Sequence, residues 1–401
     1  MNRESSAGGN SSLLPLLDDT AARHDPRAFA EEQTRLGKVW TFLGLGSDVS
    51  GVNDWFTASL GGRSVVVQRF EAGLRAFENR CAHRGYPLRT EARGNGALVC
   101  GFHHWRYNAD GLALGIPECP AMFGKTPREL DARLEPVEIA ECGGLIFGRF
   151  GDGTAISLRD WLGPAFPILA HISDTLADGL AKPAGAFERV VRANWRYMMD
   201  ISLDDYHIVA VHPSTFGQEG YIPAGNIHYA RFGAHSAYLS GGEADELTRF
   251  ARNCEAGTFV PARYRILQIF PTLIVSTVRA LRFNGESYWF LVLQHLVPEA
   301  HDRTRSISRF FPLRQAETDS LPRKLIRKAL WPGTSFGFRY YARRVHMEDN
   351  AVCETLQAAA RPDTPPPRLA RQEERIGWFS DSYVRIMAGE MPSAAAKPSD
   401  A

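Results

Sequence analysis

The chain has 401 residues, of which 44% are hydrophobic and 11% aromatic, so it is long enough to bury a large core and to form two domains. A formal net charge of +1 argues against general attraction to nucleic acid or to an anionic membrane. Six cysteines in so long a chain do not indicate a disulfide scaffold. The sequence begins without an apolar signal-type stretch and contains no long apolar run, so we expect a cytoplasmic protein with no membrane contact.

The first part of the chain predicts a small β domain. Residues 1–12 are polar and are expected to be loose, and residues 29–42 predict a helix that leads into the first strand. Short strand-like runs at 63–70, 74–78 and 145–150 then alternate or cluster apolar residues between glycine-rich turns, which is typical of such a domain.

Four residues inside this β region have the types and spacing of metal ligands. They are Cys81, His83, Cys100 and His103, arranged as Cys-x-His, sixteen intervening residues and Cys-x2-His. In a Rieske [2Fe-2S] cluster two imidazoles replace two thiolates on one of the irons. Each short pair can supply one thiolate and one imidazole, while the long interval lets the second loop fold back beside the first. The pattern therefore predicts a Rieske cluster.

Zinc is the alternative, because it accepts the same donors. Zinc sites usually pair Cys with Cys and His with His, which this spacing does not do. His104 is an alternative ligand, but the two-residue gap after Cys100 favours His103. We predict that Trp105 and Tyr107 pack over the loop, and we assign no function to the remaining cysteines Cys119, Cys142, Cys254 and Cys353.

A second motif follows a connecting segment, residues 151–183, that carries helical and proline-rich pieces. Asp204, His207 and His212 are arranged as Asp-x2-His-x4-His, and two imidazoles with one carboxylate form the facial triad of non-haem Fe(II). Asp204 and His207 share a helical face, whereas His207 and His212 are about 140° apart on a straight helix. Because Pro213 disfavours the α conformation at His212, we expect the helix to loosen or end between residues 208 and 212.

The rest of the chain predicts long strands followed by helices. Residues 264–278, 287–297 and 306–312 are rich in strand-forming residues, and helical regions are expected near 339–360 and 372–387. This order indicates an α+β domain. The tail after Met391 has the composition of a disordered segment.

The helical stretch 340–357 offers candidates for the iron carboxylate. Its apolar residues recur at helical intervals and mark one face: Tyr341, Val345, Val352 and Leu356. Glu354 falls on the opposite side, while Glu348 and Asp349 flank the apolar face about equally, so periodicity leaves both open. Candidate cavity residues, which are equally compatible with core packing, are Phe216, Phe270, Leu291, His295, Phe336 and Phe338.

Taken together, the motifs resemble the catalytic α subunit of the Rieske non-haem iron oxygenases, the ring-hydroxylating oxygenase family, over nearly the whole chain. The resemblance rests on Cys81-Ala-His83-Arg84-Gly85, Cys100-Gly-Phe-His103-His104-Trp105, Asn194-Trp195-Arg196 with Asp200 ahead of Asp204, and Asp349 followed by Glu354 and Gln357. The chain departs from the usual family pattern at Ala82, Arg196 and Asp200, where proline, lysine and glutamate are common. None of these changes removes a metal ligand, although each can alter the hydrogen bonds that orient ligands.

The resemblance implies a fold and a set of site residues. It implies an α+β fold with an N-terminal all-β Rieske domain and a C-terminal helix-grip domain around a mononuclear iron. The expected boundaries are an arm at 1–40, the Rieske domain at 41–155, the catalytic domain at 156–391 and a disordered tail at 392–401. It also implies that Asp349 binds iron with His207 and His212, and that Asp204 bridges to His103 of a neighbouring subunit for electron transfer.

The implied activity is that of a terminal oxygenase component. It would use O2 and electrons from NAD(P)H, through a separate reductase and possibly a ferredoxin, to mono- or dihydroxylate an aromatic or similarly apolar molecule. Oxidative O- or N-demethylation is the alternative within the family. A Rieske electron carrier and a structural zinc protein are more distant alternatives. The expected assembly is a homotrimer, with or without a β subunit.

Overall fold

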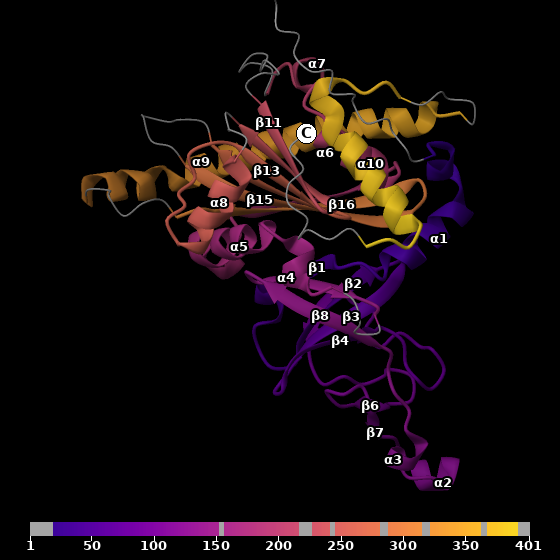
Figure 1. Cartoon of the computed structure of the whole chain (residues 1–401). Helices are drawn as coiled ribbons and strands as arrows, with labels where there is room; N and C mark the ends of the chain where they lie inside the picture. Colours follow the sequence, from indigo (N-terminus) through magenta and orange to yellow (C-terminus); the bar gives the residue numbers. More distant parts are fainter. Residues whose placement is uncertain are drawn as a thin grey trace, which may run out of the picture.

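The computed structural model describes residues 19–151, 156–215, 227–240, 245–280, 288–314, 321–361 and 367–391. The expectations for residues 1–12, for the tail at 392–401 and for Phe216 fall outside these ranges. Within them the chain forms two seven-stranded antiparallel sheets, one in each half, with helices gathered on the C-terminal half (Figure 1). The expected α+β class, with a sheet-based domain in the N-terminal half, is confirmed.

The N-terminal half starts with a short 3-10 helix, η1 (Ala21–His24), and helix α1 (Pro26–Leu36). Asp25 caps α1 by accepting a hydrogen bond from the Arg27 N–H, and Pro26 occupies the first helical position. The prediction of a helix over 29–42 was too long at its C-terminal end. The helix ends at Leu36, before Gly37, and the next buried residues pair as a strand instead.

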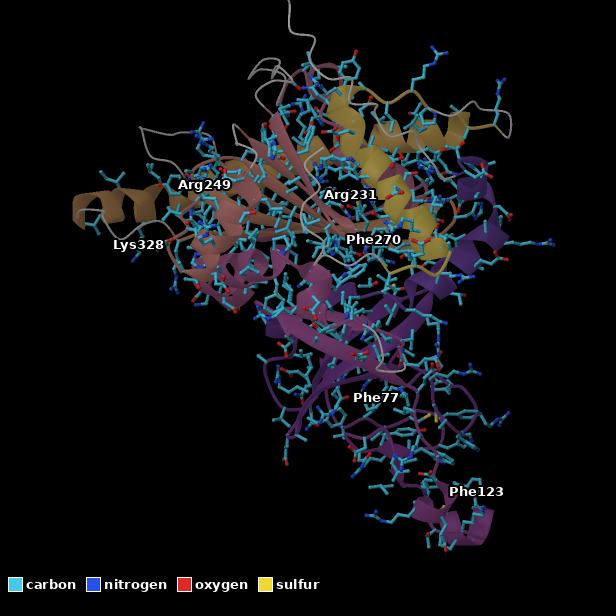
Figure 2. All side chains as sticks on the ribbon, viewed as in Figure 1. Phe77, Phe123, Arg231, Arg249, Phe270 and Lys328 are labelled. Carbon is cyan, nitrogen blue, oxygen red and sulfur yellow. The ribbon has the colours of Figure 1, made fainter. Side chains whose placement is uncertain are left out.

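The N-terminal sheet has the order β1 (Thr41–Leu45), β9 (Leu145–Arg149), β8 (Pro136–Cys142), β4 (Gly73–Glu78), β3 (Arg63–Phe70), β2 (Asp54–Leu60) and β5 (Arg93–Asn95), with η2 (Gly46–Val49) after β1. The strands expected at 63–70, 74–78 and 145–150 are confirmed. A small outer layer is formed by β6 (Arg106–Tyr107), β7 (Ala113–Gly115), α2 (Cys119–Phe123) and α3 (Pro127–Leu130). It lies at the end of the molecule farthest from the helices, where Figure 2 labels Phe123.

The connecting segment is helical, as expected. It contains α4 (Leu158–Leu162), α5 (Ala165–Ala170), the π-helical turn η3 (His171–Leu176) and η4 (Asp178–Leu180). Its fully buried residues Trp161 and Ile168 belong to the same hydrophobic core as Trp40 and Phe147 of the first half and Phe270 of the second. The two halves therefore share one continuous core.

The C-terminal sheet has the order β10 (Gly185–Val191), β16 (Arg303–Pro312), β15 (Trp289–Ala300), β14 (Leu273–Arg279), β13 (Arg265–Ile269), β12 (His235–Ser240) and β11 (Ile227–Phe232). The prediction of one long strand over 264–278 was wrong. The segment is the β13–β14 hairpin, with Ile269 paired to Leu273 across a turn that contains Pro271. Proline has no N–H for the ladder, so Pro271 favours a break in the pairing at this point, where the chain turns back.

The helices of this half are α6 (Trp195–Leu203), α7 (Ile208–Val211), α8 (Glu246–Glu255), α9 (Leu321–Ala359) and, after η7 (Arg371–Glu373), α10 (Glu374–Met387). The long helix α9 begins well before the expected residue 339, even though Pro332 lies inside it. Packing outweighs this breaker, because Trp331 and Phe338 both stack on Phe290 of β15, at 5.6 and 4.0 Å between ring centroids. Among the described helices, none has the length and apolar character needed to cross a bilayer.

Ion pairs hold the N-terminal segment against α6 and involve two of the departures from the family pattern. Arg196 lies 3.3 Å from the buried carboxylate of Glu32 on α1, and Asp200 lies 2.5 Å from the buried guanidinium of Arg23. The unusual residues Arg196 and Asp200 therefore attach α6, which leads directly into the second metal motif, to the first helices of the chain.

Candidate functional site

The first candidate site lies at the far end of the N-terminal half, on the loops after β4 and before β6. Both loops close with the same kind of backbone hydrogen bond, from Gly85 N–H to the Cys81 carbonyl at 2.9 Å and from His104 N–H to the Cys100 carbonyl at 3.0 Å. Gly85 and His104 each have a positive φ, 74° and 56°, which turns the chain back after the ligand pair. Two similar turns thus present two similar Cys/His pairs.

The four candidate ligands fall into two pairs. Both cysteines are buried, at 3% and 1% exposure, whereas the imidazoles are half-buried, with their Nδ1 atoms 3.2 Å apart. Trp105 stacks on His83 at 4.7 Å with an interplanar angle of 9°. Burial and the neighbouring His103 and Arg84 lower the pKa of His83, which favours the neutral form that binds metal.

These donors fit a two-iron cluster better than one zinc ion. In the part of the chain that the structure describes, the group of at least three donor atoms gathered within 4.8 Å is His207, His212 and Asp349, and it includes none of Cys81, His83, Cys100 and His103. A tetrahedral zinc site would bring its four donors around one point. Two buried thiols and two outer imidazoles are the ligand set that a Rieske [2Fe-2S] cluster would take.

Tyr107 has a role that sequence reasoning missed. Packing against the loop was expected, but its hydroxyl also lies 3.0 Å from Cys81 Sγ and accepts a hydrogen bond from the Ala82 N–H at 3.0 Å. If Cys81 binds the cluster as a thiolate, it has no proton to donate, so the Tyr107 hydroxyl would be the donor in this contact. The hydrogen bond from residue 82 to the Tyr107 hydroxyl requires a backbone N–H, which Ala82 has and the proline common at this position in the family lacks.

We expect Tyr107→Phe to lower the reduction potential of the cluster. A hydrogen bond to a ligand sulfur favours the more negative, reduced state. Its loss should lower the potential by about 40 mV, the one-electron equivalent of about 1 kcal/mol. Redox titration followed by visible absorption measures the change. Ala82→Pro, which removes only the supporting N–H, should give a smaller shift in the same direction, and an unchanged potential in both variants would contradict the role of this hydrogen bond.

The second candidate site surrounds α7. Helix α6 ends at Leu203, Asp204 has an extended backbone, and its Oδ1 accepts hydrogen bonds from the N–H groups of Tyr206 and His207 at 2.6 and 3.1 Å. The expectation that Asp204 and His207 share a helix was therefore wrong, because the aspartate side chain competes with the helical backbone and turns the chain. His207 and His212 flank the single turn of α7. His212 leaves the helical conformation, at φ −112° and ψ 46°, as Pro213 predicts.

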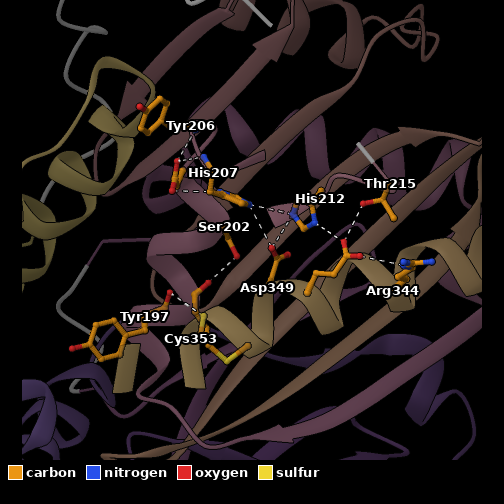
Figure 3. Close-up of polar contacts among 12 residues, drawn as sticks. Tyr197, Ser202, Tyr206, His207, His212, Thr215, Arg344, Asp349 and Cys353 are labelled. Atoms are coloured by element: carbon orange, nitrogen blue, oxygen red, sulfur yellow. Dashed lines mark hydrogen bonds and ion pairs between the residues drawn. The ribbon is translucent and has the colours of Figure 1, made fainter. Parts of the chain in front are cut away.

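His207, His212 and Asp349 meet at one point (Figure 3). The two Nε2 atoms are 3.2 Å apart, and they lie 3.4 Å (His207) and 3.0 Å (His212) from Asp349 Oδ1. Burial lowers the pKa of His207, but hydrogen bonds with Asp204 and Asp349 outweigh it and raise the pKa to about 10. Burial raises the pKa of Asp349, but its contacts with both imidazoles lower it overall.

This arrangement fits a divalent metal ion. Asp349 Oδ1 is buried and faces two imidazole nitrogens without a hydrogen bond of good geometry, so three donor atoms surround one position. Two imidazoles and one carboxylate are the ligand set of non-haem Fe(II).

The structure gives separate positions to the two acids that helical periodicity left open. Asp349 faces the Nε2 atoms, while Glu348 Oε2 lies 2.8 Å from His212 Nδ1 and accepts from Thr215 Oγ1 at 3.1 Å. Glu348 was missed as a functional residue. The available signal was chemical, because a metal-bound histidine commonly donates its other N–H to a carboxylate.

We expect Glu348→Gln to weaken metal binding without abolishing it. Loss of the carboxylate that orients a ligating imidazole typically costs about 10–100-fold in metal affinity or activity. Iron content after dialysis against a graded series of chelator concentrations measures the effect. Glu354→Gln, on the opposite side of α9, is the matched control. Equal iron retention in the two variants would argue against a role for the contact between Glu348 and His212 in metal binding.

A cavity of about 120 Å³ lies beside these residues, between α6 and α9 on one side and the sheet on the other. Of the candidate cavity residues, Phe338 lines it. The others that the structure describes do not: Phe270 and Leu291 pack in the core, His295 faces Phe42 of the other domain, and Phe336 is 65% exposed. Strand alternation explains Leu291 and His295, because Val292 and Gln294 point into the cavity from β15 and their odd-numbered neighbours point away.

The two candidate sites do not meet within one chain. The loops around β6 and the helix α7 lie at opposite ends of the molecule (Figure 1). Asp204 is near the surface beside the exposed Tyr206, and its carboxylate Oδ2 lies 3.4 Å from His207 Nδ1. The expected partner of Asp204, His103, is therefore remote from it in the same chain.

Comparisons with known proteins agree with this architecture. Residues 39–130 match the Rieske [2Fe-2S] domain family, and residues 178–389 match the catalytic domain of the ring-hydroxylating alpha subunits. The chain is 26% identical to the large subunit of anthranilate 1,2-dioxygenase from Burkholderia cepacia over 82% of this chain and 80% of that protein. It is 32% identical to the oxygenase subunit of glycine betaine monooxygenase from Chromohalobacter salexigens, over 47% of this chain and 42% of that one.

Solved structures share the fold. Naphthalene 1,2-dioxygenase from Rhodococcus sp. bound to indole superposes with a TM-score of 0.68 at 21% identity, covering 92% of this chain and 94% of that one. A quaternary ammonium Rieske monooxygenase in complex with L-carnitine gives a TM-score of 0.65 at 18% identity, covering 94% and 96%. Because the catalytic-domain family matches more than half of the chain, the protein belongs to the ring-hydroxylating oxygenase alpha subunits and carries their N-terminal Rieske domain.

Proposed function

We propose that this chain is the terminal oxygenase component of a multicomponent system that hydroxylates a small organic substrate. The observation that carries the proposal is the convergence of His207, His212 and Asp349 beside a lined cavity, in a chain that also has a Rieske domain. Family membership supports it. Both aromatic dioxygenases and quaternary ammonium monooxygenases occur among the relatives, so hydroxylation that ends in demethylation is the second candidate.

The proposed ligands follow from the two geometries. Cys81, His83, Cys100 and His103 would hold the cluster, and His207, His212 and Asp349 would hold the iron, where dioxygen is activated with electrons supplied through the cluster. Glu348 keeps the His212 ring in place. The apolar residues that line the cavity exclude water from the reacting position.

We further propose that electrons pass between chains in a homotrimer, by way of Asp204. The separation of the two sites within one chain supports this, since electron tunnelling falls steeply with distance. Apolar side chains are exposed near both proposed contacts: Phe102 next to His103, and Tyr206 and Val209 next to Asp204. Electrons would reach the cluster from a separate reductase or ferredoxin that draws on NAD(P)H.

A spectrum and an oxygen electrode test the proposal. Anaerobically purified protein should be red-brown and contain iron and acid-labile sulfide, whereas a structural zinc protein would be colourless. With a reductase and NADH, it should consume oxygen and incorporate it into a product when an accepted substrate is present. A coloured protein that exchanges electrons but never consumes oxygen with any member of a broad substrate panel would instead indicate an electron carrier.

A further inference from the structure

The cavity beside the proposed iron ligands has two walls of different chemistry. On one side lie α6, α9 and the residues that flank α7, which include the proposed iron ligands His207, His212 and Asp349, and the sheet faces them across the cavity. About half of the lining residues are apolar, including Ile266, Ile274 and Val292 from the sheet. Apart from the proposed iron ligands and the neighbouring aspartates, the polar lining residues include Ser276 and Gln294 of the sheet and His346 of α9.

The volume of the cavity limits the size of its occupant. An apolar cavity of about 150 Å³ is known to hold one benzene molecule. At about 120 Å³ among the described residues, this cavity is slightly smaller than that, so its size limits the occupant to a single ring. A fused two-ring compound would require the walls to move apart.

The charges around the cavity are already balanced. None of the described lining residues is lysine or arginine. The buried guanidinium of Arg375 donates to Ser236 Oγ at 3.2 Å and lies next to Asp205, but Arg375 does not itself line the cavity. Apart from the metal site itself, a substrate carboxylate would therefore find no cationic side chain in the described lining, and burying it there is costly.

The acidic lining residues also have partners. Asp349 faces the two imidazoles, Asp204 accepts backbone hydrogen bonds, and Asp205 Oδ2 accepts from the Tyr229 hydroxyl at 2.7 Å. The aromatic rings of Tyr264, Phe338 and Tyr341 line the cavity, and one face of Phe338 is covered by its stack on Phe290. A cationic ammonium substrate thus finds no uncommitted carboxylate among the described lining residues.

Two polar side chains are held in place with hydrogen-bonding capacity to spare. The Gln294 amide donates to Ser306 Oγ at 3.4 Å, and an amide carries a second N–H and a carbonyl oxygen. His346 Nε2 lies 3.3 Å from Ser308 Oγ, and its ring is parallel to that of Phe187, at 6.3 Å and 14°. These contacts fix the direction in which Gln294 and His346 present their remaining polar atoms.

We propose that the substrate of this site is an uncharged single-ring compound with one hydrogen-bonding substituent, which Gln294 and His346 bind while the ring contacts the apolar walls. The inference rests on the proposed oxygenase function and narrows its substrate class. Hydroxyl, methoxy and carboxamide groups have the required chemistry. Carboxylates and quaternary ammonium groups do not.

Matched probe pairs test the inference by calorimetric binding to the full-length, iron-loaded protein. Benzamide and benzoate have the same shape and differ in charge, and anisole and ethylbenzene differ in one hydrogen-bonding oxygen. We expect the first member of each pair to bind about 10–100-fold more tightly, the range expected when a buried polar group is left unpaired. Benzyltrimethylammonium and naphthalene should bind more weakly than benzamide.

Variants assign the preference to the two side chains. Gln294→Leu and His346→Phe should each reduce the anisole preference over ethylbenzene toward unity while leaving ethylbenzene binding unchanged. His295→Phe, on the same strand but facing the other domain, should keep the preference. Since the wild-type panel alone decides the substrate class, the test does not depend on the variants folding.

The outcomes separate this inference from the proposed function. Tighter binding of benzoate, of the ammonium probe or of naphthalene, or no binding of any single-ring probe, would overturn the inference even if the enzyme proved to be an oxygenase. Selective binding of benzamide and anisole without reductase-dependent oxygen consumption would instead leave the binding preference intact and count against the oxygenase function.

Discussion

His207→Ala is expected to abolish oxygen-dependent turnover while leaving the visible spectrum of the Rieske cluster unchanged. The imidazole is one of three donors around one position, and its Nε2 lies 3.2 Å from that of His212. Its loss leaves one imidazole and one carboxylate, which is too few protein ligands for stable non-haem iron. Iron analysis should show loss of the mononuclear iron with both cluster irons retained. Asp349→Ala should behave in the same way.

His228→Ala is the control, because His228 lies on β11 outside the three-residue ligand group. It should keep both the iron content and the turnover of the native protein. If His207→Ala lost the cluster colour together with its turnover, the separation of the chain into two independent metal sites would be wrong. If it kept full turnover, the ligand assignment would be wrong.

Asp204→Asn is expected to keep both metal sites and to lose the transfer of electrons between them. The asparagine oxygen can still accept the backbone hydrogen bonds of Tyr206 and His207 that the Asp204 carboxylate accepts at 2.6 and 3.1 Å, so the turn should persist. The substitution removes the negative charge and the second oxygen, which faces His207 Nδ1. Turnover should fall because electrons reach the mononuclear site more slowly, while the iron content stays at the native level. Stopped-flow reoxidation of the reduced cluster should slow in parallel.

Mixed assemblies make this prediction specific for transfer between subunits. His103→Ala removes the proposed cluster ligand, and neither this variant nor Asp204→Asn should be active alone. Co-expression should restore part of the activity, because an intact cluster in an Asp204→Asn chain can then face an intact Asp204 in a His103→Ala chain. Failure to recover activity in verified mixed trimers would contradict electron transfer between subunits. Near-normal turnover of Asp204→Asn alone would contradict the role of Asp204 as the bridge between His103 and the iron site.

Local patterns were sufficient for much of the fold. The strand at 63–70 and the helix over 374–387 follow from apolar alternation and helical spacing. Ligand chemistry at fixed spacing predicted His207 and His212, while Asp349, which the structure brings to them, was implied only by the family resemblance. Predictions failed where a long-range contact or a single side chain decided the outcome. Stacking of Trp331 and Phe338 on Phe290 extends α9 through Pro332, and no local pattern reports that contact.

Hydrogen bonds between distant side chains were the least accessible from sequence. The contact of Tyr107 with Cys81 and that of Glu348 with His212 depend on the relative placement of different loops and helices. Helical periodicity could not separate Glu348 from Asp349, because adjacent residues differ by about 100° and both border the same face. The His212 ring distinguishes them, because its Nδ1 atom contacts Glu348 and its Nε2 atom faces Asp349.

The hydrophobic core that runs from Trp40 through Trp161 to Phe270 has a mechanical consequence. A Rieske half tethered by a bare linker could swing toward its acceptor, but a half that shares buried tryptophans with the catalytic sheet cannot rotate without exposing them to water. The position of the Rieske domain relative to the catalytic sheet is therefore fixed when the chain folds. In the proposed trimer, the rate of electron transfer would then depend on how neighbouring subunits dock, because docking sets the distance between the cluster of one subunit and the iron of the next. A substitution at that contact would change this distance and therefore the rate.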